Sequence, residues 1–368
     1  MCDGNKCNLS GNKGEWSSIY VLLKLLGDGQ ICGADGYLVK DYNKNHFIDK
    51  ITRNENGTEI EYRISNDGST IIIPGLDSYE IDSDVVRKQC SELFYEIMKG
   101  KNSFSLPNTE HFLKTIRCNK LQSKITDGSE IAVLFHDNGD EKIKTKKFSI
   151  TSCIGSSPTL VNASGSTNVK YLLSGKINES IMKKANAYFQ SNSKSKVMDG
   201  MLYLKNQGIG LSYYDTDSII FKENLSIIND SMPELVGELL KLYYGEGINR
   251  LSDLVERLEI DDPLGFVDNG VKNHYSQYVK QLLILYSLGM KSSKKWIPDA
   301  DGNNGMIVVK NDGSLVYYES NDPEEYGNFL LRNTRLETPS TKRHQFAFVY
   351  SDYGSYYVKL NLQIRFVW

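Results

Sequence analysis

The middle of the sequence contains two strand-like stretches, Glu130-Ile131-Ala132-Val133-Leu134-Phe135 and Lys147-Phe148-Ser149-Ile150, separated by the turn-rich segment Asp137-Asn138-Gly139-Asp140. Apolar runs on either side of an Asn-Gly turn are typical of two antiparallel strands in a hairpin. Side chains along a strand point alternately to its two faces. We therefore predict that Glu130, at the start of the first strand, faces Ser149 and Thr151 on the second.

Oxygen atoms that converge at such a hairpin would suit a hard divalent cation. Carboxylates of Glu130 and the nearby Asp127 would hold one or two Mg²⁺ ions, which polarise a phosphodiester and lower the pKa of an attacking water. A neighbouring lysine usually supplies compensating charge in such a site. A glutamate at the start of a strand is far more often solvated than bound to metal. The residues alone therefore leave both interpretations open.

Helical and strand-like segments precede the hairpin. Apolar residues spaced three and four apart predict helices over residues 12–27 and 83–99. Gly27 and Gly29 offer the end of the first helix and Gly100 that of the second. Short alternating stretches separated by Asn-Gly and Asp-Gly turns predict strands and hairpins over 37–85.

Helices and strands also follow the hairpin. Ser231, Pro233 and Glu234 form the pattern of a capping box, which predicts a helix over 232–244. A further apolar-periodic helix is predicted over 275–288. The final ninety residues are strand-like, and the last strand, 356–366, is long enough to be central in a sheet. This succession favours an α+β or mixed α/β fold without a clean domain boundary.

Composition excludes several protein classes. The chain has 368 residues, of which 40% are hydrophobic and 24% charged, as expected for a globular protein of two or three domains. Its net charge of −3 neither supports nor excludes nucleic acid as a partner. No apolar run is long enough to span a membrane and no secretory signal is visible, so we expect an intracellular protein with free thiols. Phosphate-loop, zinc-protease and serine-hydrolase motifs are absent.

Six blocks of sequence resemble the HpaII family of type II restriction endonucleases. They occur in that family's order from about residue 11 to residue 366. The blocks read GNKGEWS at 11–17, FSITS at 148–152, PTLVNAS at 158–164, NT at 333–334, PSTKRH at 339–344 and KLNLQIRF at 359–366. So many unusual strings in the same order make the resemblance specific.

The resemblance implies a site-specific DNA endonuclease. Its fold would be a PD-(D/E)XK-like mixed sheet flanked by helices, and its reaction the Mg²⁺-dependent cutting of double-stranded DNA at the palindrome CCGG. The enzyme would be cytoplasmic and part of a restriction-modification system, with a DNA methyltransferase as genetic partner and no stable complex. A two-fold symmetric homodimer is the simplest assembly that recognises a palindromic DNA site. We expect a flexible N-terminus at 1–10, a nuclease core at 11–175, and a DNA-recognition part at 176–368.

The family's active-site hairpin carries an acidic residue and the motif Ser-Ile-Lys-Ser. In this chain the acidic residue matches Glu130, where the family tends to have Asp, and the lysine position is Thr151. Cys153 stands where Gln is typical. The loss of the lysine removes a positive charge beside the scissile phosphate. Either another lysine, at 124, 146 or 147, takes over, or the chain is a weakened or silent DNA-binding homologue.

Other expected site residues come from the helix, the loop after the hairpin and the C-terminal part. Glu15 on the first helix would be a further catalytic carboxylate and metal ligand, or only a first-turn residue that favours the helix dipole. Small polar residues after the hairpin suit DNA contacts, and so do basic residues near the C-terminus, where arginine can read guanine. The expected DNA-binding residues are Ser156, Ser157, Thr159, Asn162, Ser164, Arg335, Arg343, His344 and Arg365. A carbohydrate hydrolase with two carboxylates is the competing class, without supporting spacing.

Overall fold

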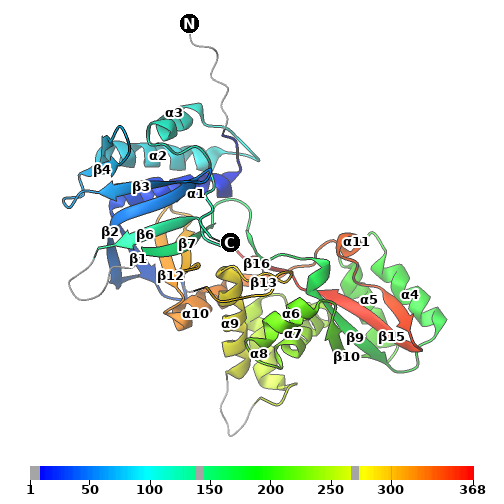
Figure 1. Ribbon diagram of the computed structural model, residues 1–368. Coiled ribbons are helices and arrows are strands. Elements are labelled where there is room, and N and C mark those ends of the chain that lie inside the picture. The colour runs from blue at the N-terminus through cyan, green and yellow to red at the C-terminus, as the bar shows by residue number, and fades with distance from the viewer. Residues whose placement is uncertain (1–8, 127, 137–144, 267–272, 300) are drawn as a thin grey trace.

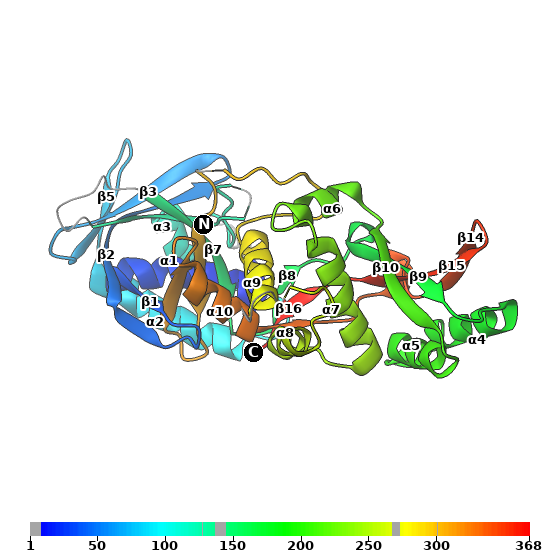
Figure 2. The ribbon, with the colours of Figure 1, turned by 90° about the horizontal axis from the view of Figure 1, so that it is seen from below.

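The computed structural model describes residues 9–126, 128–136, 145–266, 273–299 and 301–368. The expected flexible segment 1–10 falls almost entirely outside these residues, as do Asp127 and the turn at 137–140. The fold is a mixture of helices and strands, as predicted from the sequence. Figures 1 and 2 show an elongated molecule with a barrel-containing lobe at one end and a second sheet at the other.

Six strands of the first lobe close into a ring. Around the ring they are β1 (Gln30–Ala34), β12 (Leu315–Glu319), β11 (Gly305–Val309), β7 (Thr145–Ser152), β6 (Ile131–Phe135) and β2 (Lys40–Glu55). β2 pairs back with β1, so the ring has no free edge. The β1–β12 and β7–β11 pairs are parallel and the others antiparallel.

The length of β2 explains how the ring joins a larger sheet. Its first half pairs with β1, and its second half pairs with both β6 and β3. Three more strands continue the sheet outward: β3 (Thr58–Ile64), β4 (Thr70–Ile73) and β5 (Tyr79–Asp82). The resemblance implies a mixed sheet flanked by helices; the sheet is mixed, but six of its strands form a closed ring. Its β11 and β12 come from residues 305–319, so the chain returns to this lobe after residue 175.

Helix α1 (Lys13–Asp28) is buried along most of its length and packs on β7, β1 and β2. Asn12 caps it: the Asn12 side chain accepts from the Glu15 backbone, and the Glu15 carboxylate accepts from the Asn12 backbone. Gly29 ends it at a φ of 63°, which favours glycine. Helix α2 (Ser83–Lys99) covers α1, and α3 (Pro107–Thr115) follows it. The predictions of helices at 12–27 and 83–99 are confirmed.

The second lobe holds two small antiparallel sheets. One contains β10 (Gly210–Thr216), β9 (Asn168–Ser174), β15 (Ser355–Asn361) and β14 (Val349–Asp352); the other contains β13 (Thr334–Leu336), β16 (Ile364–Phe366) and β8 (Thr159–Val161). The helices are α4 (Glu179–Phe189), α5 (Lys196–Asn206), α6 (Ile219–Ser226), α7 (Met232–Glu246), α8 (Leu251–Asp261), α9 (His274–Ser287), α10 (Pro323–Arg332) and α11 (Thr341–His344), with the 3₁₀ turn η1 (Gly165–Thr167). No helix among the described residues is long and apolar enough to cross a membrane.

Two sequence predictions about this lobe are wrong in detail. The helix after Ser231 exists, but Ser231 makes no side-chain cap, because the preceding turn is closed by Asn229, whose side chain accepts from the Ser231 backbone. The predicted strand 356–366 is two strands in different sheets. It breaks at 362–363, where Leu362 donates to the Thr167 carbonyl and Gln363 accepts from Glu337.

The apolar core has two parts, one on each face of the β7–β11–β12 wall. Phe148, Ile307 and Tyr317 belong to the core cluster that includes α1, and the rings of Phe135, Phe148 and Tyr317 contact one another. Met306, Val308 and Tyr318, on the opposite face, join the core of the second lobe. Of the six cysteines, the four in the described residues are free and buried, as expected. The wall therefore connects the two lobes through packed side chains.

We predict that Phe148→Ala lowers the free energy of unfolding by about 3–5 kcal/mol, because it leaves a cavity among aromatic rings that cannot collapse. Phe148 is fully buried. The matched control is Tyr42→Ala, which removes a ring from a 77% exposed position on β2 of the same barrel. Urea denaturation followed by circular dichroism measures both, and equal losses would contradict the packing described here.

Candidate active site

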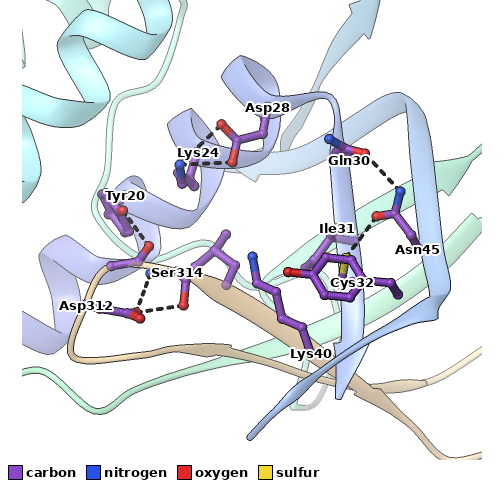
Figure 3. Close-up of a pocket in the computed structure, with 13 residues that line it drawn as sticks. Tyr20, Lys24, Asp28, Gln30, Ile31, Cys32, Lys40, Asn45, Asp312 and Ser314 are labelled. Atoms are coloured by element: carbon purple, nitrogen blue, oxygen red, sulfur yellow. Dashed lines mark hydrogen bonds and ion pairs between the residues drawn. The ribbon is translucent and has the colours of Figure 1, made fainter.

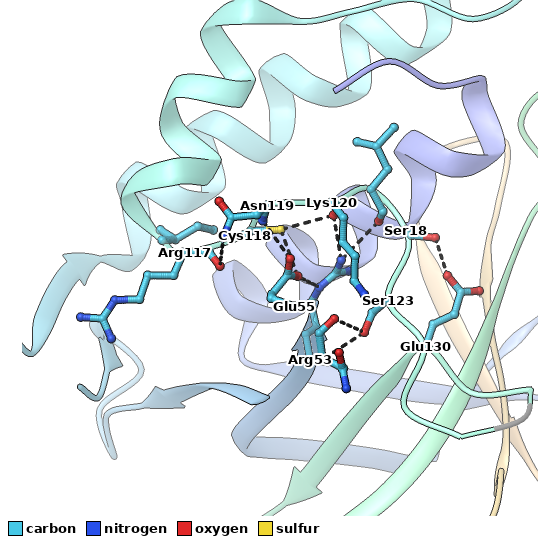
Figure 4. A network of polar contacts seen from close by, with 12 residues as sticks. Ser18, Arg53, Glu55, Arg117, Cys118, Asn119, Lys120, Ser123 and Glu130 are labelled. Atoms are coloured by element: carbon cyan, nitrogen blue, oxygen red, sulfur yellow. Dashed lines mark hydrogen bonds and ion pairs between the residues drawn. The ribbon is translucent and has the colours of Figure 1, made fainter. Parts of the chain in front are cut away.

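Glu130 lies at the point where the β6–β7 hairpin meets α1. Its backbone N–H donates to the Phe148 carbonyl at 2.8 Å, which aligns it with β7 just before β6 begins. Its carboxylate accepts from two sides: from the Ser18 hydroxyl at 2.8 Å, and from the Ile150 backbone N–H at 3.4 Å. Figure 4 shows the Glu130 carboxylate directed toward Ser18. The carboxylate therefore bridges the hairpin and the helix.

Two adjacent serines on α1 make polar contacts with the hairpin region. Ser17 and Ser18 are both buried, and the Ser17 hydroxyl reaches the Ser152 hydroxyl of β7 at 2.9 Å. Helix and strand are thus joined by polar side chains inside an otherwise apolar interface. Sequence reasoning missed both residues, although two serines within an apolar helical segment are a usable signal.

Burial raises the pKa of the Glu130 carboxyl above its ordinary value. The hydrogen bonds from Ser18 and Ile150 and the positive charge of Arg53 oppose that rise, because they favour the ionised form. Arg53, on β2, is fully buried and forms an ion pair with Glu55 at 3.0 Å. Its remaining contacts include the Lys120 carbonyl at 3.0 Å (Figure 4). Arg53 is therefore a buried positive charge inside this lobe. The sequence did not predict it as a site residue.

Ser149 and Thr151 point to the opposite face of β7 from α1. Alternation along the strand places Phe148 and Ile150 against the α1 core, whereas Ser149 and Thr151 align with Met306 and Val308 of β11. The Ser149 hydroxyl donates to the Gly305 carbonyl at 3.2 Å. Thr151 is 6% exposed, and its hydroxyl has no hydrogen-bond partner among the described residues. The prediction that Glu130 faces Ser149 and Thr151 is therefore wrong. The Glu130 carboxylate lies beside the backbone of β7 and bonds to α1, whereas the two side chains point to the other face of the strand.

The lysines that could replace the missing one differ in their surroundings. Lys146 Nζ binds both oxygens of the nearly buried Glu319 at 2.8 Å. Lys147 Nζ donates to the Asp301 carbonyl at 2.6 Å. Lys124 is exposed on the segment before the hairpin. The two lysines on β7 are therefore already engaged in contacts with the 301–319 region.

Glu15 occupies the capping box of α1, which is the helix-end role that the sequence left open beside a catalytic one. A third carboxylate, Asp127, lies outside the described residues. Within the described ranges, no group of three or more His, Cys, Asp or Glu side chains is arranged to hold a metal ion.

Several predicted DNA-contact residues meet on the three-stranded sheet. Arg335 of β13 pairs with Arg365 of β16, and Arg365 pairs with Thr159 of β8. The Arg365 guanidinium binds Glu337 at 2.9 Å and the Ser157 carbonyl at 2.6 Å. Through the Ser157 carbonyl, Arg365 therefore holds the loop that follows the β6–β7 hairpin.

The remaining predicted contacts lie around this sheet. Ser156 and Asn162 are exposed, and the Ser164 hydroxyl contacts Ser166 at 2.6 Å. Arg343 is exposed on α11, and the carbonyl of its neighbour His344 accepts from Asn168. The pKa of His344 is lowered by partial burial and by the charge of Arg343.

A pocket of about 420 Å³ lies at the other end of α1 from Glu15 and is shown in Figure 3. Its polar groups mostly satisfy one another: Lys24 pairs with Asp28 at 2.9 Å, and the Asn45 side chain donates to Gln30 at 2.9 Å. Lys40 points into it. Two carboxylates, Asp28 and Asp312, line it, but each is bonded to a neighbour on its own segment. We assign it no catalytic role.

Comparison with known proteins places these features in a family. The family model for the HpaII restriction endonuclease matches residues 12–366. The type II restriction enzyme HpaII of Haemophilus parainfluenzae is 31% identical over 361 residues, which cover 97% of this chain and 99% of that enzyme. No solved structure matches the chain. A match over nearly the whole of both chains confirms the resemblance found in the sequence, and this chain belongs to the HpaII restriction endonuclease family.

Proposed function

We propose that this chain is a type II site-specific endonuclease that hydrolyses phosphodiester bonds in double-stranded DNA at CCGG. The single observation that carries the proposal is the Glu130 carboxylate, held between α1 and β7 by Ser18 and the Ile150 N–H. The family membership supports nuclease chemistry in general. We also propose that the enzyme is cytoplasmic and belongs to a restriction-modification system, in which a methyltransferase protects host DNA.

The residues fit a magnesium ion that is only partly coordinated by protein. Mg²⁺ usually takes one or two carboxylates and completes its shell with water and substrate phosphate. Each Glu130 oxygen accepts one hydrogen bond and keeps lone-pair capacity for a cation. Glu130 would hold the ion, with Asp127 and Glu15 as further candidates. When bound, the ion would polarise the phosphate and lower the pKa of the attacking water.

The protein's own residues would orient this carboxylate and favour its ionised form against the effect of burial. Ser18 and the Ile150 N–H fix its direction, and the buried charge of Arg53 favours its anionic form. We propose that α1 and the β6–β7 hairpin are the part of the fold that corresponds to a PD-(D/E)XK core. Cleavage would then lie within 11–175 and recognition mostly within 176–368, although β11 and β12 complete the barrel. A homodimer would present two such sites to a palindrome.

One observation favours a second candidate, a DNA-binding homologue that cleaves weakly or not at all. The lysine position is the buried Thr151, and Lys146 and Lys147 of the same strand are engaged elsewhere. A silent protein would still bind CCGG duplexes with a strong dependence on salt. Binding and cleavage must therefore be measured separately.

We predict that the purified chain cuts a plasmid containing CCGG sites in the presence of Mg²⁺, and that excess EDTA stops the cleavage. Glu130→Gln keeps an acceptor for Ser18 but removes the negative charge, so the cleavage rate falls by a factor of about 100 or more, or about 3 kcal/mol of barrier. Sequencing of the ends maps the cut.

The control variant is Glu59→Gln, which removes an exposed carboxylate on β3. It should cleave as the parent does. Equal rates for the Glu130 and Glu59 variants would remove Glu130 from the mechanism. If the parent and both variants leave the plasmid intact but bind the duplex tightly, the chain is the DNA-binding homologue that does not cleave.

We predict that Thr151→Lys cleaves at least as fast as the parent, because it returns an ammonium group to the position where the family has lysine. The change also buries charge, so a lower melting temperature is expected. Thr151→Val is the isosteric control: it removes a hydroxyl that has no partner, and its rate should stay within about twofold of the parent. A folded lysine variant slower than both would show that Thr151 does not take the lysine's place.

We predict that Arg343→Ala lowers cleavage at CCGG by about 10- to 100-fold, because a bidentate contact to guanine is worth about 1–3 kcal/mol. Arg343 is exposed and available for such a contact. Arg63→Ala, which removes an exposed arginine from β3, is the control. Competition between CCGG and single-substitution duplexes measures the effect; unchanged discrimination would exclude Arg343 from base recognition.

A further inference from the structure

A basic loop with the sequence Lys-Ser-Ser-Lys-Lys-Trp follows α9 at residues 291–296. It is held by one buried side chain, Asn224 of α6. The Asn224 amide nitrogen donates to the Lys291 and Lys294 carbonyls, each at 2.9 Å, and its oxygen accepts from the Trp296 backbone N–H at 2.8 Å. Asn224 is fully buried. Its three hydrogen bonds give the loop one backbone conformation.

The loop lies beside the candidate hairpin. A pocket of about 440 Å³ is lined by Lys291, Lys294, Lys295 and Trp296 on one side and includes Thr126, four residues before Glu130. Asn303, also in the pocket wall, donates to the Gly128 carbonyl at 3.2 Å. The backbone at Thr126 and Gly128, just before Glu130, and the basic loop therefore lie beside the same pocket.

The same loop contacts the segment that the sequence singled out for DNA. The Ser292 hydroxyl lies 2.9 Å from that of Ser166, which in turn contacts Ser164 at 2.6 Å. Figure 2 shows the segment between α9 and β11 running from beside α6 toward the barrel lobe. The 291–296 loop thus lies beside Thr126 and contacts the 164–166 turn, both of which are distant from it in sequence.

The charge of this surface suits a polyanion. Lys291, Lys294 and Lys295 are all exposed. Among the described residues, Asp299 also lines the pocket, and Glu223 lies 3.6 Å from Lys295. Lysine ammonium groups bind phosphate as point charges and carry no base specificity. A rigid loop loses little conformational entropy when it binds.

We propose that the 291–296 loop binds the sugar-phosphate backbone of the duplex and holds the DNA beside Glu130. The inference rests on the proposed function, because it names the surface that brings the same substrate to the same site. The lysines act on affinity, equally for every sequence. Discrimination of CCGG is left to other residues.

The test is duplex binding by fluorescence anisotropy in EDTA, so that no cleavage intervenes. Lys294→Gln combined with Lys295→Gln should weaken binding about five- to tenfold at about 50 mM salt and make the slope of log affinity against log salt shallower by about 2. The loss should be equal for a CCGG duplex and a scrambled one. Lys88→Gln combined with Lys205→Gln removes the same charge from exposed positions on α2 and α5 and is the control.

Matching thermal melts of the two double variants exclude loss of fold. A lysine-loop variant that binds like the control would overturn the inference while leaving the proposed function intact. A selective loss on the CCGG duplex alone would also overturn it, because it would make the loop a reader of bases. A parent chain that binds no duplex at all would overturn the proposed function and the inference together.

Discussion

The bridge from the Ser18 hydroxyl to the Glu130 carboxylate and on to the Ile150 N–H holds the candidate site together. Burial makes an ionised carboxylate costly, and its hydrogen bonds and the fixed charge of Arg53 offset part of that cost. The same contacts define where the carboxylate points. If the helix and hairpin moved apart, Glu130 would lose both its direction and its stabilisation, and no other described carboxylate occupies that position.

The closed ring of strands keeps the helix and hairpin in place. Strands β11 and β12, from the last quarter of the chain, pair with β7 and β1 and put apolar side chains on both faces of one wall. One face packs on α1 and the other on the second lobe. The wall thereby couples the region around Glu130 to the three-stranded sheet with Arg335 and Arg365. It also places the 291–296 loop, which leads directly into β11, next to the hairpin.

Local patterns in the sequence predicted much of this structure, but they did not predict the pairing of strands that are far apart in the sequence. The spacing of Trp16, Tyr20 and Leu23 predicted α1, and the alternation around Phe148 predicted the hairpin. Ring closure depends on pairing between Gly33 and Tyr317, which are nearly three hundred residues apart and leave no local signal. The break after Asn361 depends on contacts to Thr167 and Glu337. Of the candidate site, Glu130 was predicted from pattern and resemblance, whereas Ser18 and Arg53 join it only because the fold brings them close to Glu130.

Anomalous diffraction from a crystal of the chain with a CCGG duplex and Mn²⁺ tests the central claim most directly. The account predicts a manganese peak at coordinating distance, about 2.0–2.2 Å, from a Glu130 oxygen and beside a backbone phosphate. A peak bound by other residues, with Glu130 still bonded only to Ser18 and Ile150, would contradict it.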